Sequence, residues 1–200
     1  MNKGDFQMTN EQIKLRSLIM TALFTAIICI LAQVIIPLPL VPITGQTLGI
    51  GLAATILGSR YGTISVILYI MIGATGVPVF AEFSGGIAKL FGPTGGYLIG
   101  FIPTAFFIGY YLEKTNFLFI HAMIANTIGM VITLAFGTLW LKIAANLTWA
   151  VAIASGVTPF IIMGLIKAAL ASWVGIIVKK RLVSAKLLRP IHHEGNHESI

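Results

Sequence analysis

Long stretches of almost uncharged, apolar sequence dominate this chain and limit its fold more than any other feature. Only 10% of the residues are charged whereas 57% are hydrophobic, and the charges gather near the two ends. A transmembrane helix needs roughly 20 mostly apolar residues, and several runs reach that length. Because a soluble domain carries about one quarter charged residues, the sequence predicts an integral membrane protein.

The apolar runs divide into six predicted helices once one interrupted stretch is split. The stretch 47–73 contains Arg60 within the short segment 58–62. As a single span it would hold Arg60 near the bilayer centre, which costs about 2.5–3.5 kcal/mol. Two short helices joined by a tight turn at Arg60 avoid that cost. The other predicted spans are about 17–36, 94–112, 117–141 and 150–178, the last with Pro159 in a bent or separate first turn.

Basic residues at the two ends of the chain predict its orientation. Lys3, Lys14 and Arg16 precede the first span, and the cluster 179–181 follows the last. Six spans leave both termini on one side, and the lysine and arginine excess assigns that side to the cytoplasm. We therefore expect an all-α, six-helix membrane protein with both termini cytoplasmic. Its predicted parts are an N-terminal segment 1–16, a membrane domain 17–178 and a basic C-terminal tail 179–200.

The connections assigned to the outside differ from those assigned to the cytoplasm. The outer connections, 37–46, 74–93 and 142–149, are longer and carry Gly, Pro, Thr, Gln and Glu, whereas the cytoplasmic turns are tight. Long irregular backbone near a membrane is usually functional or a linker, and at membrane depth it must be buried in protein or line a cavity. The outer face is therefore the predicted ligand-capturing face.

Lys167 is the most informative single residue. It lies twelve residues before Lys179, which at about 1.5 Å per residue places it about 18 Å into the membrane from the cytoplasmic side. A lysine stem bridges only part of that distance, so the ammonium group should face the bundle interior and meet an anion or carbonyl groups. Two interpretations remain: an anchor for a substrate carboxylate, and a structural pair with a buried carbonyl or acid.

Polar residues of the predicted outer loops form a second group of candidates. For Glu82 three roles stay open: a ligand contact, a partner for Lys89 or Lys167, and simple solvation. Lys89 would either attract an anionic substrate or be solvated. Thr44 and Gln46 lie in one polar segment, where the glutamine offers both a donor and an acceptor.

Two further kinds of site complete the candidates. Thr94 and Tyr97 belong to a Gly-rich segment at a predicted helix start, whose free N–H groups can bind an anion. A turn with Thr94 as the N-cap explains the same segment without a ligand. Tyr69 and Asn126 are polar groups at membrane depth, where interhelical hydrogen bonding is the usual explanation and ligand contact the alternative.

Motifs of other functional classes are missing from the sequence. It contains no G-x-x-x-x-G-K-[ST] loop, no H-E-x-x-H, no G-x-S-x-G and no acidic cluster for a metal. Cys29 is the only cysteine, which excludes an internal disulfide. We expect a transporter rather than an enzyme, with no cofactor, no metal and no nucleic-acid partner, and with its energy supplied by other subunits. An intramembrane lipid-modifying enzyme is a weaker alternative, because it usually needs an acidic metal site.

Several short segments occur in one order that carries a family resemblance. They are Val41-Pro42-Ile43-Thr44-Gly45-Gln46-Thr47-Leu48-Gly49, Gly76-Val77-Pro78-Val79-Phe80-Ala81 and Gly92-Pro93-Thr94-Gly95-Gly96-Tyr97-Leu98, followed by Gly156-Val157-Thr158-Pro159-Phe160 and Leu165-Ile166-Lys167-Ala168. Together they resemble the BioY family, the biotin-specific S components of energy-coupling factor (ECF) transporters. The resemblance covers about residues 17–178.

The resemblance implies a six-helix S component of a bacterial plasma membrane that captures biotin from outside. It implies partnership with a transmembrane coupling subunit and two cytoplasmic ATPases, and it implies that Ala22 and Ala26 face the coupling subunit. One departure matters: the family usually carries Asp three residues before the lysine, where this chain has Gly164. Either Glu82 or Asn126 takes the place of that carboxylate, or the chain is an S component for another small carboxylated vitamin.

These candidates combine into a predicted biotin pocket between the outer loops and the outer halves of helices four to six. Lys167 or Lys89 would pair with the valerate carboxylate, and apolar walls such as Phe80 would hold the sulfur ring. Gln46, Asn126 and Tyr97 would address the ureido edge. The predicted substrate-binding residues are Thr44, Gln46, Tyr69, Phe80, Glu82, Lys89, Thr94, Tyr97, Asn126 and Lys167.

Overall fold

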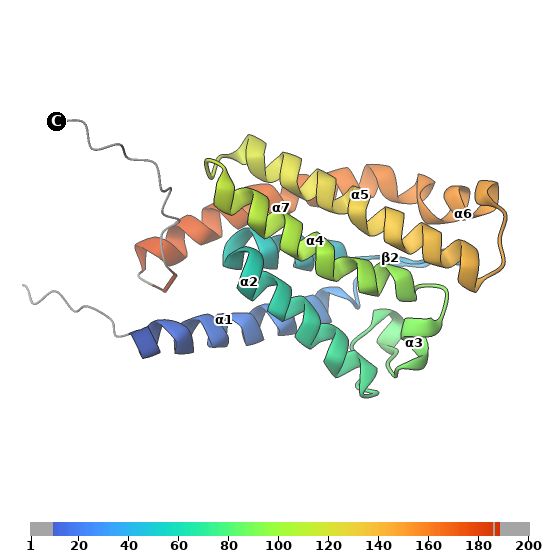
Figure 1. The fold of residues 1–200 in the computed structure, drawn as a ribbon, viewed down its shortest axis with the longest axis horizontal. Helices are drawn as coiled ribbons and strands as arrows, with labels where there is room; N and C mark the ends of the chain where they lie inside the picture. The colour runs from blue at the N-terminus through green and yellow to red at the C-terminus, as the bar shows by residue number, and fades with distance from the viewer. Residues whose placement is uncertain (1–9, 186, 189–200) are drawn as a thin grey trace, which may run out of the picture.

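The computed structural model describes residues 10–185, 187 and 188, which form a helical bundle with one very small sheet (Figure 1). Candidate spans are found in five stretches that are long and apolar enough to cross a membrane, the last of them 149–184. The long helices are α1 (Asn10–Leu31), α2 (Gln46–Ala74), α4 (Gly95–Lys114), α5 (Phe119–Ala144) and α7 (Thr158–Ser184). Their connections contain β1 (Ile35–Ile36), β2 (Ile43–Thr44), η1 (Ala81–Phe83), α3 (Ala88–Phe91) and α6 (Trp149–Gly156).

α2 turns back on itself at Gly58 and so supplies two of the predicted helices. Gly58 has φ +83° and ψ −173°, a conformation that essentially only glycine adopts. A Cβ on Gly62 would lie 2.8 Å from Ala54 Cα, whereas eight residues of straight helix span about 12 Å. The arms 46–57 and 59–74 therefore lie against each other, as predicted, but the turn is at Gly58 rather than at Arg60.

Two other predicted helix ends differ from the structure. α1 ends at Leu31 rather than near Ile36, because Ile35 and Ile36 pair antiparallel with Thr44 and Ile43 as β1 and β2. β-Branched residues favour strands. The predicted break in the last span is present: α6 and α7 are separate helices, with a proline in the first turn of α7. α7 continues to Ser184, six residues past the predicted end of the membrane domain at residue 178.

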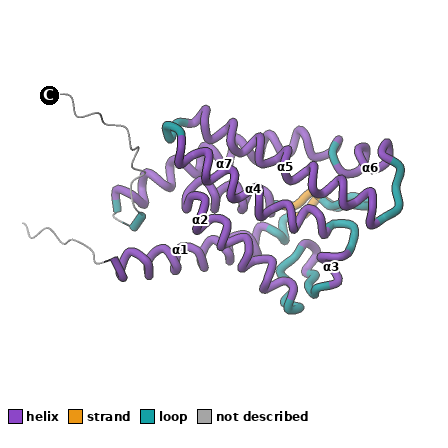
Figure 2. Tube along the Cα trace, in the orientation of Figure 1, coloured by secondary structure: helices purple, strands orange, loops and turns teal. Residues whose placement is uncertain are grey.

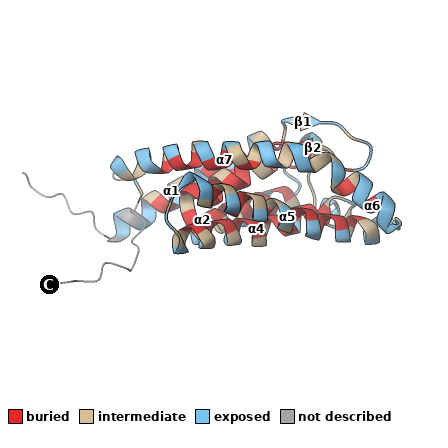
Figure 3. Cartoon of the chain, turned by 90° about the horizontal axis from the view of Figure 1, so that it is seen from above, coloured by how far each residue is buried: buried red, intermediate tan, exposed pale blue. Residues whose placement is uncertain are grey.

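The helices pack around α2 and α4. α2 contacts α1, α4 and α7, and α5 contacts α4 and α7 (Figure 2). Buried residues follow the inward faces and exposed ones the outer faces (Figure 3). Small residues permit the close contacts, since a Cβ on Gly100 of α4 would lie 2.8 Å from Phe136 Cβ of α5. Many outward side chains, Leu18 and Ile19 among them, are large and apolar, as expected of helices surrounded by lipid.

The two ends of the bundle differ in composition. The start of α1, the Gly58 turn, the α4–α5 turn and the end of α7 lie together at one end (Figure 1). We call it the basic end, because its charges include Lys14, Arg16, Arg60, Lys114, Lys179, Lys180 and Arg181. The strands, η1, α3 and α6 lie at the opposite end, which we call the loop end. The tail residues 189–200 of the predicted C-terminal part lie outside the described residues.

Candidate functional site

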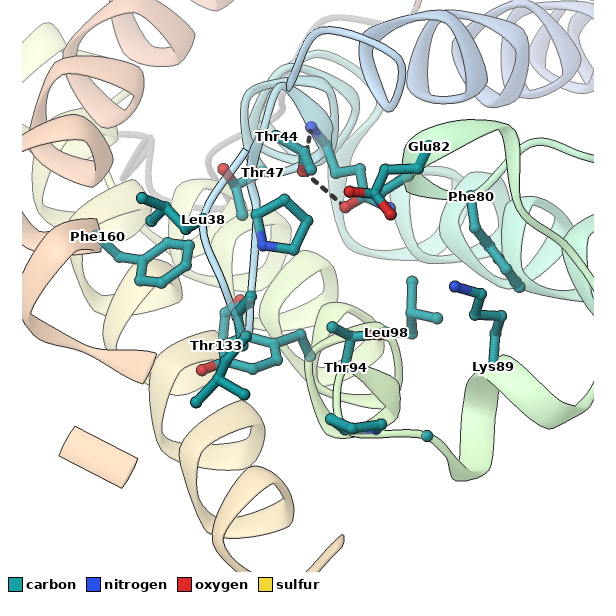
Figure 4. A pocket seen from close by; sticks show the side chains of 18 of the residues that line it. Leu38, Thr44, Thr47, Phe80, Glu82, Lys89, Thr94, Leu98, Thr133 and Phe160 are labelled. Carbon is teal, nitrogen blue, oxygen red and sulfur yellow. Dashed lines mark hydrogen bonds between the residues drawn. The ribbon is translucent and has the colours of Figure 1, made fainter. Parts of the chain in front are cut away.

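A cavity of about 260 Å³ lies within the loop end of the bundle (Figure 4). Its walls come from the β1–β2 connection, the start of α2, the loop around η1, the α3–α4 connection and parts of α4, α5 and α7. The charged side chains in its lining are one carboxylate, Glu82, and two cations, Lys89 and Lys167. The rest of the lining is apolar or carries hydroxyl and amide groups, so the cavity suits a partly apolar molecule with an anionic group.

The cavity brings together most of the predicted binding residues. Thr44 and Lys167, for example, are 123 positions apart in the sequence yet in contact. Tyr69 and Asn126 are the two predicted residues outside the lining. The eight that line the cavity are Thr44, Gln46, Phe80, Glu82, Lys89, Thr94, Tyr97 and Lys167. Their contact with a ligand stays a prediction.

Lys167 connects α7 to the strand end beside the cavity. Its Nζ donates to Thr44 O at 2.7 Å and to Thr47 Oγ1 at 3.4 Å. The contact with a carbonyl matches one of the two predicted interpretations, a structural pair inside the bundle. These contacts do not use all of the hydrogen-bond donors of Lys167, because an ammonium group has three N–H donors. One N–H donor therefore remains beyond these two contacts.

A chain of side-chain hydrogen bonds supports the wall on the α2 side. Thr44 Oγ1 donates to Gln46 Oε1 at 2.7 Å, and Gln46 Nε2 donates to Tyr69 Oη. Tyr69 is fully buried and packs edge-on against Phe80, with ring centroids 5.5 Å apart. A Cβ on Gly73 would overlap the Phe80 ring, so glycine is needed at that position. Tyr69 therefore lies behind the wall, where it orients Gln46 and Phe80.

Tyr97 joins α4 to the α6–α7 junction. Its hydroxyl donates to Gly156 O at 2.9 Å, and its ring lies 6.1 Å from that of Phe160, centroid to centroid. A phenol has one proton to donate, and here that proton is used by the carbonyl. Tyr97 thus presents its ring to the cavity and can offer a ligand only an acceptor.

Glu82 and Lys89 stand on the loop side of the cavity, near Phe80 (Figure 4). Both are exposed. Within the part of the chain that the structure describes, no ion pair joins Glu82 to Lys89 or Lys167, which disfavours the predicted pairing. Of the roles left open for Glu82, ligand contact and solvation remain.

Asn126 lies deeper, between α2, α5 and α7. Its Nδ2 is within hydrogen-bond distance of Ala122 O (2.9 Å), Thr55 Oγ1 (3.1 Å) and Ser172 Oγ (3.2 Å). This is the interhelical bonding that is usual for a polar residue at membrane depth. Asn126 also lines a smaller cavity of about 50 Å³ that shares Thr47, Thr133, Leu134, Phe160 and Lys167 with the larger one.

Gly164 borders the smaller cavity, and its neighbour explains how the missing side chain is accommodated. A Cβ on Gly164 would overlap Met130 Sδ. The flexible Met130 side chain, which also lines the smaller cavity, therefore fills the space beside α7 that a larger residue at position 164 would need.

Several lining residues were not among the sequence candidates. Thr47 directly follows Gln46 in the segment 41–49, which carries the family resemblance, and could have been included on that ground. Phe160 ends another such segment and could have been included on the same ground. Thr133 lies in an apolar helix, where nothing in the local sequence distinguishes the face toward the cavity from the face toward lipid. Thr133 is paired with Thr104, their hydroxyl oxygens being 2.8 Å apart. The other unpredicted lining residues include Leu38, Ser84, Leu98, Phe101 and Leu134.

The predicted partner-contact residues lie apart from the cavity lining. Ala22 and Ala26 are both exposed, four residues apart on α1. They form a small-residue surface that permits close approach of another helix.

Comparison with known proteins gives consistent matches over nearly the whole chain. The profile of the BioY family matches residues 7–184. The biotin transporter BioY2 of Lactococcus lactis subsp. cremoris (strain MG1363) is 40% identical over 172 residues, which cover 86% of this chain and 94% of that protein. The biotin transporter BioY of Thermotoga maritima is 41% identical over 166 residues, or 83% of this chain and 97% of that protein.

A solved structure has the same arrangement of helices. It is the crystal structure, at 2.1 Å, of the S-component for biotin from an ECF-type ABC transporter. The superposition has a TM-score of 0.78 with 34% sequence identity, and it covers 87% of this chain and 95% of that one.

Proposed function

The chain belongs to the BioY family, and from that premise we propose that it captures biotin outside the cell as the S component of an ECF transporter. It is a multi-pass protein of the cell membrane and a transport protein rather than an enzyme. The observation that carries the proposal is the cavity at the loop end, which places two lysines, an amide and several hydroxyls among apolar walls.

The chemistry of the cavity matches the parts of biotin. Biotin has a carboxylate at the end of an aliphatic chain, a sulfur-containing ring and a polar ureido group. Lys89 or Lys167 pairs with the carboxylate, and aromatic side chains such as Phe80 and Phe160 enclose the apolar parts. The threonine hydroxyls and Gln46 face the ureido group. Buried donors and acceptors that a ligand leaves unpaired penalise analogues, so such a site discriminates strongly.

The distribution of charge supports an orientation with the basic end in the cytoplasm. The basic end carries the lysines and arginines named above, whereas the charges of the loop end include Glu82, Lys89 and Lys142. Lysine and arginine are retained on the cytoplasmic side during membrane insertion. In this orientation the start of α1 and the end of α7 face the cytoplasm, and the cavity faces the outside.

A transmembrane coupling subunit and two cytoplasmic ATPases complete the proposed transporter. The sequence has no phosphate-binding loop of its own, and the exposed Ala22 and Ala26 offer a surface for a partner helix. Replacing either alanine with tryptophan should weaken co-purification with the coupling subunit and leave biotin binding by the isolated chain unchanged.

Binding of radiolabelled biotin to the purified chain in detergent tests the function directly. Unlabelled biotin, lipoate and thiamine serve as competitors. Saturable binding that only biotin displaces supports the proposal. Displacement by lipoate instead would identify another carboxylated ligand, and the shift in ligand preference would then be attributed to Gly164. A folded sample that binds no biotin would refute the proposal.

Lysine variants test the assignment of the carboxylate. Lys89→Ala and Lys167→Ala each remove one cation from the cavity lining. Lys142→Ala is the matched control, because Lys142 lies near the loop end but outside the lining, with its Nζ 5.2 Å from the centre of the Trp149 ring. If neither cavity variant weakened biotin binding relative to this control, the assignment would be wrong.

A further inference from the structure

Gln33 lies between the end of α1 and the wall of the cavity and contacts both. It follows α1 by two residues and is half-buried. Its Nε2 donates to Phe80 O at 3.0 Å and to Val79 O at 3.3 Å, and lies 3.4 Å from Cys29 O of α1. Its Oε1 accepts from the N–H of Phe83 at 3.0 Å. Both ends of one side-chain amide therefore bind the backbone of the same loop.

The segment that Gln33 holds is a tight turn, residues 80–84, with an unfavourable backbone conformation. The N–H of Phe80 donates to Ser84 O at 2.9 Å and closes the turn. Inside it, Glu82 has φ +60° and Phe83 has φ +49°. This left-handed region disfavours residues that have a side chain. Because neither residue is glycine, the turn depends on contacts from outside to keep its shape.

The same turn supplies one wall of the cavity. Phe80, Ala81, Glu82 and Ser84 all line it, whereas Phe83 is outside the lining and 71% exposed. A change in the shape of the turn would therefore move four lining residues at once. Gln33 itself is not among the lining residues, so it acts on the cavity only through this backbone.

We propose that Gln33 is a positioning residue for the ligand: its amide holds the turn 80–84 in the shape that binds the ligand and ties that wall to α1. The identity of the ligand rests on the proposed function. The shape of the turn does not, and it can be measured without biotin.

Gln33→Met tests the proposal. Methionine keeps the length of the side chain but lacks both the amide donors and the strong acceptor. We expect the Kd for biotin to rise about tenfold, mainly through faster dissociation, because roughly one net hydrogen bond's worth of free energy is lost. The melting temperature of the ligand-free protein should change little. Thr75→Val is the matched control, since that hydroxyl is exposed and bonds only Ile72 O of its own helix, at 2.7 Å.

Phe83→Gly in the Gln33→Met background separates positioning from general packing. Glycine adopts positive φ without penalty, so the double variant should regain biotin affinity by about threefold over Gln33→Met. An unchanged Kd in Gln33→Met would overturn the proposal. A second outcome would also overturn it. In that outcome Gln33→Met lowers both the biotin affinity and the ligand-free melting temperature, and Phe83→Gly does not restore the affinity.

A ligand-free measurement keeps this inference separate from the proposed function. In a Cys29→Ala background, Ala81→Cys places the only thiol on the cavity wall. Gln33→Met should speed its alkylation by a small maleimide about threefold or more, because the released turn opens more often. An unchanged rate means that Gln33 does not hold the turn. Should the wild-type chain bind no biotin, the proposed function fails, and the alkylation rates still decide the role of Gln33.

Discussion

The basic end and the loop end of the bundle close in opposite ways. At the basic end the connections are short: α2 reverses at a single glycine, and α4 passes to α5 through residues 115–118. At the loop end the connections 32–45 and 75–94 are long and mostly irregular. The short connections of the basic end only join helices, whereas the long connections of the loop end provide the backbone that surrounds a cavity.

One carboxylate closes the α2 turn at the basic end. Glu113, at the end of α4, accepts from the N–H of Ser59 into Oε1 at 2.7 Å and from its hydroxyl into Oε2, also at 2.7 Å. A carboxylate at a helix start satisfies free N–H groups and the positive end of the helix dipole. One side chain thereby caps the second arm of α2 at the turn.

Several side chains from different elements support the irregular backbone of the loop end. Lys167 reaches Thr44 O, Gln33 reaches the turn 80–84, and Trp140 Nε1 donates to Gly92 O at 3.0 Å. Irregular backbone near a membrane needs such partners, since lipid offers none. Substitutions at the basic end should therefore alter stability and spare binding, whereas those at the loop end should alter binding first.

The largest effect should come from Gly58→Ala at the basic end. The added Cβ meets both a disallowed backbone conformation and Glu113 Oε1, and we expect a loss of roughly 3 kcal/mol or more of folding free energy. Thermal melting and the folded fraction on size exclusion in detergent measure it. Gly76→Ala is the control, because φ there is +103° with no atom within 4 Å of the added Cβ. Equal losses in both variants would contradict the role of the Glu113 contact.

Lys167→Ala should have the next largest effect, and at the loop end it should appear in binding. The variant removes a charged donor to Thr44 O and to the ligand, so we expect the Kd for biotin to rise about 100-fold. Calorimetric titration compares it with Lys89→Ala, for which about tenfold is expected because exposed charges contribute less. A larger effect at Lys89 would reassign the carboxylate to the loop.

Glu113→Gln should show a smaller effect confined to stability. It weakens the cap on the second arm of α2 and should lower the folding free energy by about 1 kcal/mol. Its Kd for biotin should equal that of the wild type. A clear change in Kd would mean that the two ends are coupled and that the comparison between them fails.

Tyr97→Phe should have the smallest effect of the four. It removes the hydrogen bond to Gly156 O and keeps the ring beside Phe160, so we expect a loss of less than about 1 kcal/mol in stability and a change of at most about threefold in Kd. Chemical denaturation and biotin titration measure the two quantities. A larger rise in Kd would show that the hydroxyl reaches the ligand, as predicted for the ureido edge.

The sequence predicted the long helices well and the connections less well. The cost of burying Arg60 indicated that the stretch 47–73 forms two helices, but placing the turn at Gly58 requires knowledge of the close approach of Glu113. The strand pair at Ile35 and Thr44 was not predicted. Its two-residue strands are too short to show an alternating pattern, and they form only because the chain doubles back across the loop end.

For the site, the sequence predicted which residues gather around the cavity better than it predicted their hydrogen-bond partners. Lys167 was expected to meet an anion or a carbonyl, yet nothing in the sequence identifies Thr44 O as its acceptor. Tyr69 was expected as a ligand contact or an interhelical bond, and it lies behind the wall, bonded to Gln46. Distinguishing a lining residue from a supporting one needs the distances between helices.

The membrane class and the division of the chain into long apolar helices were determined by the sequence alone, because hydrophobicity and charge act on each segment separately. Which polar groups share the cavity was decided only by the tertiary structure. That outcome depends on how each helix is rotated about its axis and how far the loops fold inward, and both follow from packing between segments far apart in the chain. Thr133 and Phe160 face the cavity for that reason, and Gln33 supports it without lining it.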